Sequence, residues 1–190
     1  MALDLQGLLQ KTGALLHGHF RLSSGLHSAD YIQCALLLEH PRDAKQIGVE
    51  LAAKIRSMAP KKIVSPALGG VIVGYVVAEA LDIPFVFTER KEGKMTLRRG
   101  FAIRPDEAVV IVEDVVTTGK STRETADVVR GAGGRVVGFA SILNRSGRDN
   151  PFDAPFVSLG AMALETYSET ICPICASGIA LDAPGSRYSK

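Results

Sequence analysis

Two adjacent acids, Glu113 and Asp114, end the apolar run in the stretch VVIVEDVVTTGKST at residues 109–122. The same stretch contains Gly119, Lys120 and Ser121, which match the tail of a nucleotide-binding P-loop. A P-loop opens with a glycine five residues before the glycine of that tail, and here Asp114 occupies the position. Because a carboxylate at that point would repel phosphates, the sequence excludes a P-loop.

A different kind of phosphate site is expected in the loop TTGKS, residues 117–121. The loop follows an apolar strand and starts a helix, so it offers backbone N–H groups, hydroxyls and the positive end of a helix dipole. Open α/β sheets also bind ligands at the carboxyl ends of their strands. Glu113 and Asp114 can accept hydrogen bonds from sugar hydroxyls and stabilise developing positive charge. The combination indicates a ribose 5-phosphate ligand. The alternative is a plain helix start after a buried strand, where two consecutive acids are costly.

The elements that position this loop read as alternating strands and helices. Short apolar, β-branched runs predict strands at 62–68, 84–90, 108–115 and 135–143, and the stretches between predict helices at 41–58, 70–81 and 120–133. Continuous apolar strands are typical of a parallel sheet covered on both faces. The pattern predicts an α/β fold with a right-handed, doubly wound, mostly parallel sheet.

The chain is expected to form one domain over residues 1–190, with a core at about 41–160. The two ends, residues 1–40 and 161–190, would pack on the core as a small hood. A formal net charge of +2 is too small to indicate a nucleic-acid partner. The start, MALDLQGLLQK, does not read as a signal peptide, and no segment reaches the roughly 18 apolar residues of a membrane span. We expect a cytoplasmic protein without membrane or nucleic-acid partners.

Cys172 and Cys175 form a CPIC pair, which has the spacing of a redox or metal site. A structural zinc ion requires four ligands, and no second cysteine pair exists. The histidines all lie far away in the sequence, at His17, His19, His27 and His40. We therefore expect a tight turn in a reducing compartment and no metal site built from protein side chains.

Residues 109–122 resemble the phosphoribosyl pyrophosphate (PRPP) motif of the type I phosphoribosyltransferases, with Glu113, Asp114, Thr117, Thr118, Gly119 and Ser121 in register. The resemblance implies that the acids face the ribose hydroxyls and that the loop holds the 5-phosphate. The implied contacts in this stretch are Glu113, Asp114, Val115, Val116, Thr117, Thr118, Gly119, Lys120 and Ser121. The implied reaction displaces pyrophosphate from C1 of the ribose by a base nitrogen, through an oxocarbenium-like transition state, with Mg²⁺ carried by the PRPP.

The rest of the chain resembles the orotate phosphoribosyltransferase family over about residues 5–185. GHFRLSSGLHSADYIQC (18–34) is similar to the family's hood, which implies base contacts from Tyr31 and Ile32, joined by Thr117. ERKEGKMTLRRGF (89–101) is similar to its mobile catalytic loop, which implies pyrophosphate contacts from Arg90, Lys91 and Lys94. The resemblance makes Lys91, Lys94 and Asp114 the catalytic residues, places pyrophosphate on Ala67, Leu68, Gly69 and Gly70, and sets Arg145 against the orotate carboxylate.

The residues themselves support part of this interpretation. Five cations lie within ten residues at 90–99, and beside an anion site such a loop can close over pyrophosphate. Without that neighbour, a charge run is usually a solvated surface. Arg145 can pair bidentately with a planar carboxylate, its alternative being a surface ion pair. The chain departs from the family at Thr96, where a loop histidine is usual, and at Gly69, where a lysine is frequent.

Two other functions share some of these features. A purine phosphoribosyltransferase would share the PRPP motif without the hood or Arg145, and a PRPP-sensing regulator would bind the ligand without turnover. A DNA-bound regulator would need a basic face or an added module, and the sequence has neither. The family is dimeric, so the resemblance implies a homodimer with shared active sites, in which Lys94 serves the neighbouring subunit. The loop at 89–101 is expected to be too long and too basic for a tight hairpin over its own core.

Overall fold

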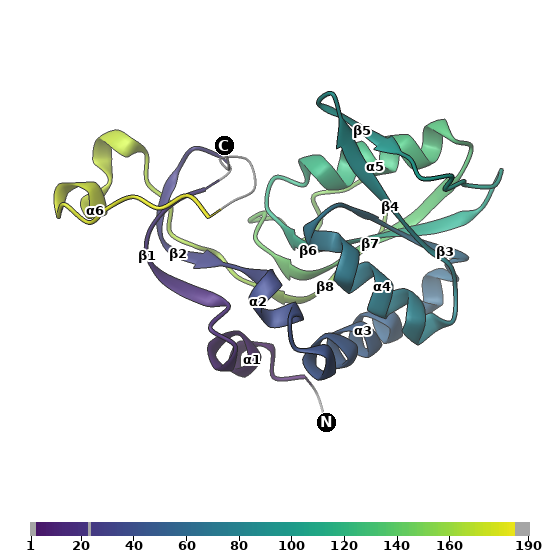
Figure 1. Ribbon diagram of the computed structural model, residues 1–190, viewed down its shortest axis with the longest axis horizontal. Helices are drawn as coiled ribbons and strands as arrows, with labels where there is room; N and C mark the ends of the chain where they lie inside the picture. The colour runs from purple at the N-terminus through teal and green to yellow at the C-terminus, as the bar shows by residue number, and fades with distance from the viewer. Residues whose placement is uncertain (1–2, 23, 185–190) are drawn as a thin grey trace.

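The computed structural model describes residues 3–22 and 24–184 (Figure 1). Ser23 and the outermost residues of the expected hood lie outside this range. The elements run in the order α1 (Leu5–Lys11), β1 (Leu15–Arg21), β2 (His27–Ile32), α2 (Cys34–Leu38), α3 (Pro41–Ile55), η1 (Arg56–Met58), β3 (Lys62–Pro66), α4 (Gly69–Leu81), β4 (Phe85–Lys91), β5 (Lys94–Leu97), β6 (Ala108–Val116), α5 (Lys120–Gly131), β7 (Arg135–Asn144), β8 (Phe156–Ala161), η2 (Glu169–Ile171) and α6 (Pro173–Ala176). None of the helices in these ranges is both long and apolar enough to cross a bilayer.

The core is a six-stranded sheet with the strand order β5-β4-β3-β6-β7-β8. All neighbouring strands are parallel except β4 and β5. This confirms the predicted doubly wound, mostly parallel sheet, and each of the seven expected elements is present within a few residues of its predicted bounds. The sequence does not predict the edge strand β8, because Ser158 and Gly160 interrupt its apolar pattern and no residue of it is fully buried.

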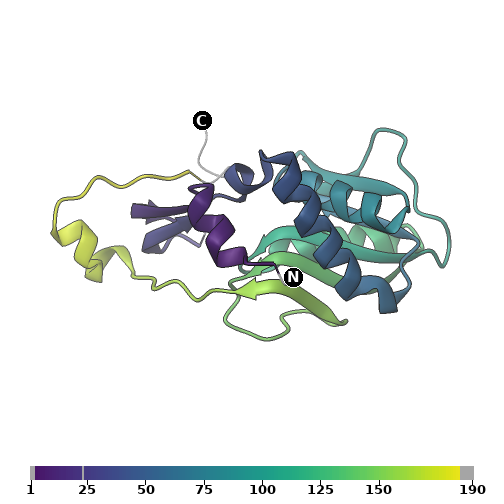
Figure 2. The same ribbon diagram turned by 90° about the horizontal axis from the view of Figure 1, so that it is seen from below.

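Helices cover both faces of this sheet, which explains the continuous apolar strands. Helices α3 and α4 lie on one face and α5 lies on the other (Figures 1 and 2). Successive strand residues point to opposite faces, so Ile63 packs with the α3–α4 core and Val64 packs with the α5 core. Burial on both sides removes the polar alternation that a half-exposed strand would show.

The segment 89–101 differs from the expected long loop. Strands β4 and β5 form a tight antiparallel hairpin in which Lys91 pairs with Lys94, so Glu92 and Gly93 alone make the turn. Both turn residues have positive φ, 52° and 81°, as a two-residue hairpin of matching twist requires. The expectation that this segment is too long and too basic for a tight hairpin is therefore wrong. Its charges are accommodated because most of them are paired: Arg98 and Arg99 both contact Glu89, at 3.2 and 2.9 Å.

The hood lies beside the core, with its parts drawn from both ends of the chain (Figures 1 and 2). Strands β1 and β2 form an antiparallel hairpin of their own. The chain after β8 runs back along this hairpin and bridges to it twice, His27 with Tyr167 and Phe20 with Asp182. The CPIC turn lies between the two bridges, so the cysteines come back to the histidines of the hairpin. The sequence-based argument that those histidines are too far away is wrong in space.

Leu51 offers a test of the apolar packing of α3 on the sheet. The side chain is fully buried, so we expect Leu51→Ala to lower the free energy of unfolding by about 2–5 kcal/mol. Val49 lies two residues earlier on the exposed side of the same helix, half of its surface being open to solvent. Val49→Ala should change the free energy of unfolding by less than about 0.5 kcal/mol. Urea titration of both variants makes the comparison, and equal losses would contradict the packing described.

Candidate active site

The loop between β6 and α5 has the form expected of a phosphate site. Gly119 is the N-cap of α5 and has a φ of 69°, a conformation that favours glycine. A side chain there would also collide, since an added Cβ would lie 2.9 Å from the Phe152 ring. The guanidinium of Arg123 donates to the Thr118 carbonyl at 2.6 Å and braces the loop. The N–H groups at the start of α5 and the positive end of its dipole are features that favour an anion, although the Lys120 N–H already donates to Thr118 Oγ1 at 3.3 Å.

Glu113, which is buried, and Asp114, which is partly exposed, form an acidic pair at the carboxyl end of β6. Burial raises the pKa of Glu113 well above its usual range, and the charge of Asp114 raises it further, against a hydrogen bond with Thr122. Burial also raises the pKa of Asp114, while a 2.7 Å hydrogen bond from the Val115 backbone N–H opposes it. Folding therefore raises the pKa of both carboxyl groups, and because the two acids interact, their titrations depend on each other.

The turn between β3 and α4 packs its backbone directly against these acids. A Cβ added at Gly69 would lie 2.5 Å from Asp114 Oδ2, and one added at Gly70 would lie 3.3 Å from Glu113 Oε1. Asp114 leaves no room for a side chain at Gly69, and at Gly70 a Cβ would be crowded by Ser65 Cβ at 3.0 Å and the Val112 carbonyl at 3.1 Å as well as by Glu113. The sequence predicted these two segments as separate anion sites, and the structure brings them into contact.

A cavity of about 670 Å³ opens beside the acids, between the core and the hood. Its volume is in the range of small-molecule sites, about 300–1,000 Å³. The cavity collects side chains from the end of β2, the β6–α5 loop and the segment after β7. Seven of the predicted site residues line it: Tyr31, Ile32, Asp114, Val115, Thr117, Thr118 and Arg145.

Arg145 reaches this cavity as a partly buried cation. Its backbone N–H donates to the Val116 carbonyl at 2.7 Å, which fixes the start of the loop after β7. Burial lowers the pKa of Arg145, while Tyr31 and other neighbours raise it. The Nε atom is buried and has no hydrogen-bond partner in the described part of the chain. A planar anion with two acceptor oxygens would satisfy this edge of the guanidinium.

The predicted basic residues Arg90, Lys91 and Lys94 lie on the β4–β5 hairpin and do not line the cavity. Arg90 pairs with Glu124 of α5, which holds the hairpin against the helix that follows the phosphate loop. Lys91 and Lys94 are exposed at the hairpin tip, and neither has an ion-pair partner within residues 3–22 and 24–184. The hairpin therefore presents two free ammonium groups.

Other predicted contacts also lie outside the cavity wall: Ala67, Leu68, Val116, Lys120 and Ser121. The Val116 side chain is buried in the core, so only its backbone is available to the site. Lys120 is exposed and lies 3.9 Å from Glu124, one turn along α5. The Ala67–Leu68 peptide bond is cis, and the Leu68 side chain is 85% exposed.

Some lining residues were not predicted: Gln33, Arg123, Ser146 and Arg148. Arg123 had a usable signal, because it stands four residues after Gly119 and so lies one helical turn beyond the anion loop. Arg148 also had one, because it lies three residues after Arg145 in the same polar segment. Together with Arg145, these two arginines give the cavity three cations.

A second, larger cavity of about 910 Å³ lies at the opposite edge of the sheet, near the starts of β3 and β6. Lys61, Lys62, Arg104 and Arg135 line it, and the buried Lys62 is already paired, bonding to Glu107 at 2.7 Å and to the Ala102 carbonyl at 2.8 Å. Because open α/β sheets bind ligands at the carboxyl edge, the smaller cavity is the candidate site.

A fold of this kind with such a loop defines a phosphoribosyltransferase, and comparison with known proteins agrees. The family model described as "Phosphoribosyl transferase domain" matches residues 36–162. The crystal structure of orotate phosphoribosyltransferase from Aeropyrum pernix superposes with a TM-score of 0.68 at 26% identity, covering 83% of this chain and 93% of that one.

Sequence relatives narrow the family further. Orotate phosphoribosyltransferase of Carboxydothermus hydrogenoformans is 48% identical over 187 residues, 97% of this chain and 98% of the relative. That of Thermotoga maritima is 46% identical over 186 residues, 98% of this chain and the whole relative. The chain belongs to the phosphoribosyltransferases and, within them, to the orotate phosphoribosyltransferase family.

The acidic pair leads to a prediction about stability and pH. Because the pKa of Glu113 is raised on folding, its ionisation costs folding free energy as pH rises from the ordinary carboxyl range through the raised value. Glu113→Gln should therefore make the ligand-free protein more stable at alkaline pH, and the gain should vanish at acid pH. Urea titrations across this pH range measure the difference.

Glu107 provides a matched control of opposite sign. Burial alone would raise its pKa, but the hydrogen bond and charge of Lys62 lower it. The stabilisation that ionised Glu107 gives to the folded state is fully present above the ordinary carboxyl pKa, and it is lost as pH falls through the lowered pKa. Glu107→Gln should cost about 1–3 kcal/mol near neutral pH, with the loss shrinking in acid. If both variants were stabilised, or both destabilised, above neutral pH, the opposite pKa shifts assigned to Glu113 and Glu107 would be contradicted.

Proposed function

We propose that this protein transfers the ribose 5-phosphate of PRPP to orotate, releasing pyrophosphate and forming orotidine 5-phosphate for pyrimidine nucleotide synthesis. The observation that carries the choice of base is Arg145, a partly buried guanidinium that lines the cavity together with Tyr31 and whose Nε has no hydrogen-bond partner in the described part of the chain. Orotate has a planar carboxylate for such a group, and purine bases have none. The names of the sequence relatives support the same base.

The fold alone does not choose the base. Adenine phosphoribosyltransferase of Leishmania tarentolae has the same fold at a TM-score of 0.61 and 20% identity. An enzyme for purines would have no use for a buried arginine edge in the base pocket. A PRPP-sensing regulator is the other alternative, and two unpaired lysines on a hairpin beside the phosphate loop favour turnover, because they can neutralise a departing pyrophosphate.

The roles proposed for the side chains follow from their positions. The 5-phosphate would bind the backbone N–H groups of the 117–121 loop at the start of α5. Asp114, which lines the cavity, would accept hydrogen bonds from ribose hydroxyls and stabilise positive charge on the ring as the bond at C1 breaks. Glu113, whose pKa is raised by burial and by the charge of Asp114, would orient Asp114 and, when protonated, limit the repulsion between them.

We place Mg²⁺ on the PRPP and not in a cage of protein ligands. Mg²⁺ prefers six oxygens in octahedral geometry, usually supplied by phosphates, waters and one or two carboxylates. Asp114 can supply one such carboxylate at the cavity, and no cluster of three or more acids is present in the described ranges. When bound, the ion would screen charge on the pyrophosphate. We further propose a cytoplasmic homodimer, in keeping with the three unpaired cysteines of a reducing compartment.

The test of base choice is PRPP-dependent loss of orotate absorbance, run beside uracil and hypoxanthine. The wild type should consume orotate alone. Arg145→Ala should raise the KM for orotate by about 10- to 150-fold, equivalent to about 1.5–3 kcal/mol for a hydrogen bond to a charged group. The KM for PRPP should change little, because Arg145 would touch only the base.

Arg130→Ala is the matched control, since Arg130 lies on the surface and pairs with Asp153 at 2.8 Å, away from the cavity. It should leave both KM values unchanged. An unaltered orotate KM in Arg145→Ala would overturn the assignment of this residue. Turnover of hypoxanthine without orotate would overturn the proposed function.

Shared sites in a homodimer lead to a complementation experiment. If Lys94 serves the partner's cavity, each site needs Asp114 from one chain and Lys94 from the other. Subunit exchange between inactive Asp114→Ala and inactive Lys94→Ala makes about half the dimers mixed, with one intact site each. About a quarter of wild-type activity should return. No recovery, with exchange confirmed by native mass spectrometry, would mean that Lys94 acts within its own chain.

A further inference from the structure

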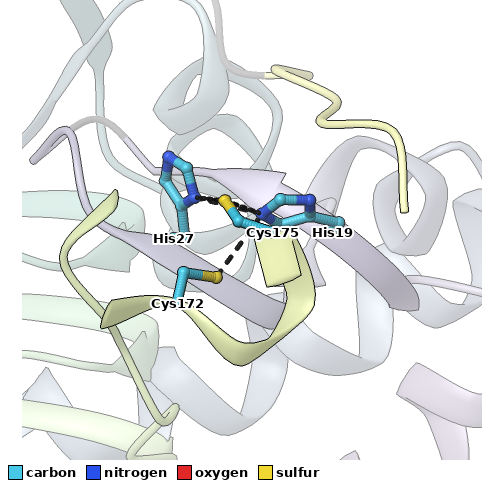
Figure 3. Close-up of side chains that lie close together, drawn as sticks. All are labelled: His19, His27, Cys172 and Cys175. Atoms are coloured by element: carbon cyan, nitrogen blue, oxygen red, sulfur yellow. Dashed lines mark hydrogen bonds between the residues drawn. The ribbon is translucent and has the colours of Figure 1, made fainter. Parts of the chain in front are cut away.

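Four potential metal ligands meet in the hood, where β1 and β2 face the CPIC turn (Figure 3). His19 comes from β1, His27 from β2, and Cys172 and Cys175 flank the start of α6. One ligand atom from each residue can be chosen so that all four lie within 4.8 Å of one another. The two histidines and Cys172 are buried, and Cys175 is the exposed member. This is the only such cluster in the described ranges.

Four of the separations inside the cluster are close to those around a tetrahedral ion. His19 Nε2 lies 3.0 Å from His27 Nδ1, and the nitrogen–sulfur separations are 3.2, 3.5 and 3.6 Å. Zinc bonds of about 2.05 Å to nitrogen and 2.3 Å to sulfur would place tetrahedral ligands about 3.3 Å apart for two nitrogens and about 3.6 Å for nitrogen and sulfur. These four separations need to change by only a few tenths of an ångström, and the other pairs, which lie within 4.8 Å, would close in by up to about 1 Å around the ion.

A hydrogen bond outside the cluster orients one ligand. His19 Nδ1 lies 2.8 Å from the Ile179 carbonyl, which can only accept, so Nδ1 carries the proton. In a neutral imidazole, Nε2 then has the lone pair, and this atom faces His27 and both sulfurs. A backbone carbonyl that fixes the tautomer of a ligating histidine is a common companion of zinc sites.

We propose that His19, His27, Cys172 and Cys175 bind one structural Zn²⁺ ion that fastens the C-terminal segment to the β1–β2 hairpin. Two cysteines and two histidines form a closed sphere for zinc, with no open position for catalysis. A two-iron cluster with this ligand set is a poor fit, because it would separate the histidines on one iron from the cysteines on the other. Here His27 Nδ1 and Cys175 Sγ are only 3.2 Å apart.

The segment that the ion would hold has almost no apolar core. Cys172 is the only fully buried residue of residues 166–184, whereas Ile171, Ile179 and Leu181 are exposed. Backbone bonds hold the segment on both sides of the cysteines: His27 with Tyr167, at 2.8 and 2.9 Å, and Asp182 with His19 and Arg21. So little apolar burial does not offset the entropy of ordering these residues, and metal binding would supply the difference.

The cluster lies at one end of the strand that carries the base contacts. His27 begins β2, and Tyr31 of the cavity wall lies four residues further along it. Thr166, also in the cavity wall, directly precedes the bridge between Tyr167 and His27. The ion would therefore stabilise the hood side of the cavity without touching a substrate.

The test measures the metal directly. Untagged full-length protein, purified without chelators, should contain one zinc per chain by elemental mass spectrometry. Cobalt exchanged for zinc should give the intense visible bands of a tetrahedral ion and thiolate-to-cobalt charge-transfer bands. Cys172→Ser, Cys175→Ser, His19→Asn and His27→Asn should each lose the zinc and be cut faster by protease after residue 161.

Cys34→Ala and His40→Asn are matched controls, since neither residue belongs to the cluster. Both variants should keep one zinc ion per chain. If the ligand variants precipitate, the cobalt spectrum of the wild type still decides. Weak octahedral bands, or a wild type that neither contains zinc nor takes it from a chelator, would overturn the proposal. So would a Cys172–Cys175 disulfide in freshly isolated, metal-free protein. Because the zinc content is measured without any substrate, this experiment can overturn the zinc site without affecting the proposed function, and the orotate assay can overturn the proposed function without affecting the zinc site.

Discussion

Direct parallel pairing of β3 with β6 is the constraint on which the candidate site depends. Parallel neighbours end at the same edge of the sheet, so the loops that follow them must share one space. Here the shared space is so small that the glycine turn after β3 packs against the acids at the carboxyl end of β6. The Gly69–Gly70 turn, the loop at 117–121 and the two carboxyl groups are thereby held close together at one edge of the sheet. Neither loop by itself combines backbone N–H groups with a pair of carboxyl groups.

The sequence predicts the core well because strands that are buried on both faces have continuous apolar runs in the sequence. The runs around Ile63 and Ile111 are continuously apolar since helices cover both sides of the sheet. The turn at Gly119 was also predictable as the start of a helix after a buried strand, whereas its binding of phosphate stays a prediction. Strand β8 has no such apolar run, since its residues are only partly buried or exposed at the edge of the sheet.

Two features could not be read from local patterns. The hairpin turn uses Glu92 with Gly93, and glutamate is a weak signal for a turn that usually carries Asn-Gly or Asp-Gly. The meeting of His19 with Cys172 depends on a sequence separation of 153 residues. They meet only because the chain returns along the β1–β2 hairpin. Isolated bridges such as that of Phe20 with Asp182 have no recognisable sequence pattern, so this return could not be predicted.

The ion pair of Arg90 with Glu124 has a consequence for how the hairpin is held. Both side chains are about one-third exposed, and a solvent-exposed pair is worth about 0–1 kcal/mol. This is comparable with thermal energy, so the pair selects a resting position for the hairpin without locking it there. Dissolved salt weakens such a contact. The position of the two lysines at the hairpin tip is therefore a property of the ionic medium as well as of the fold.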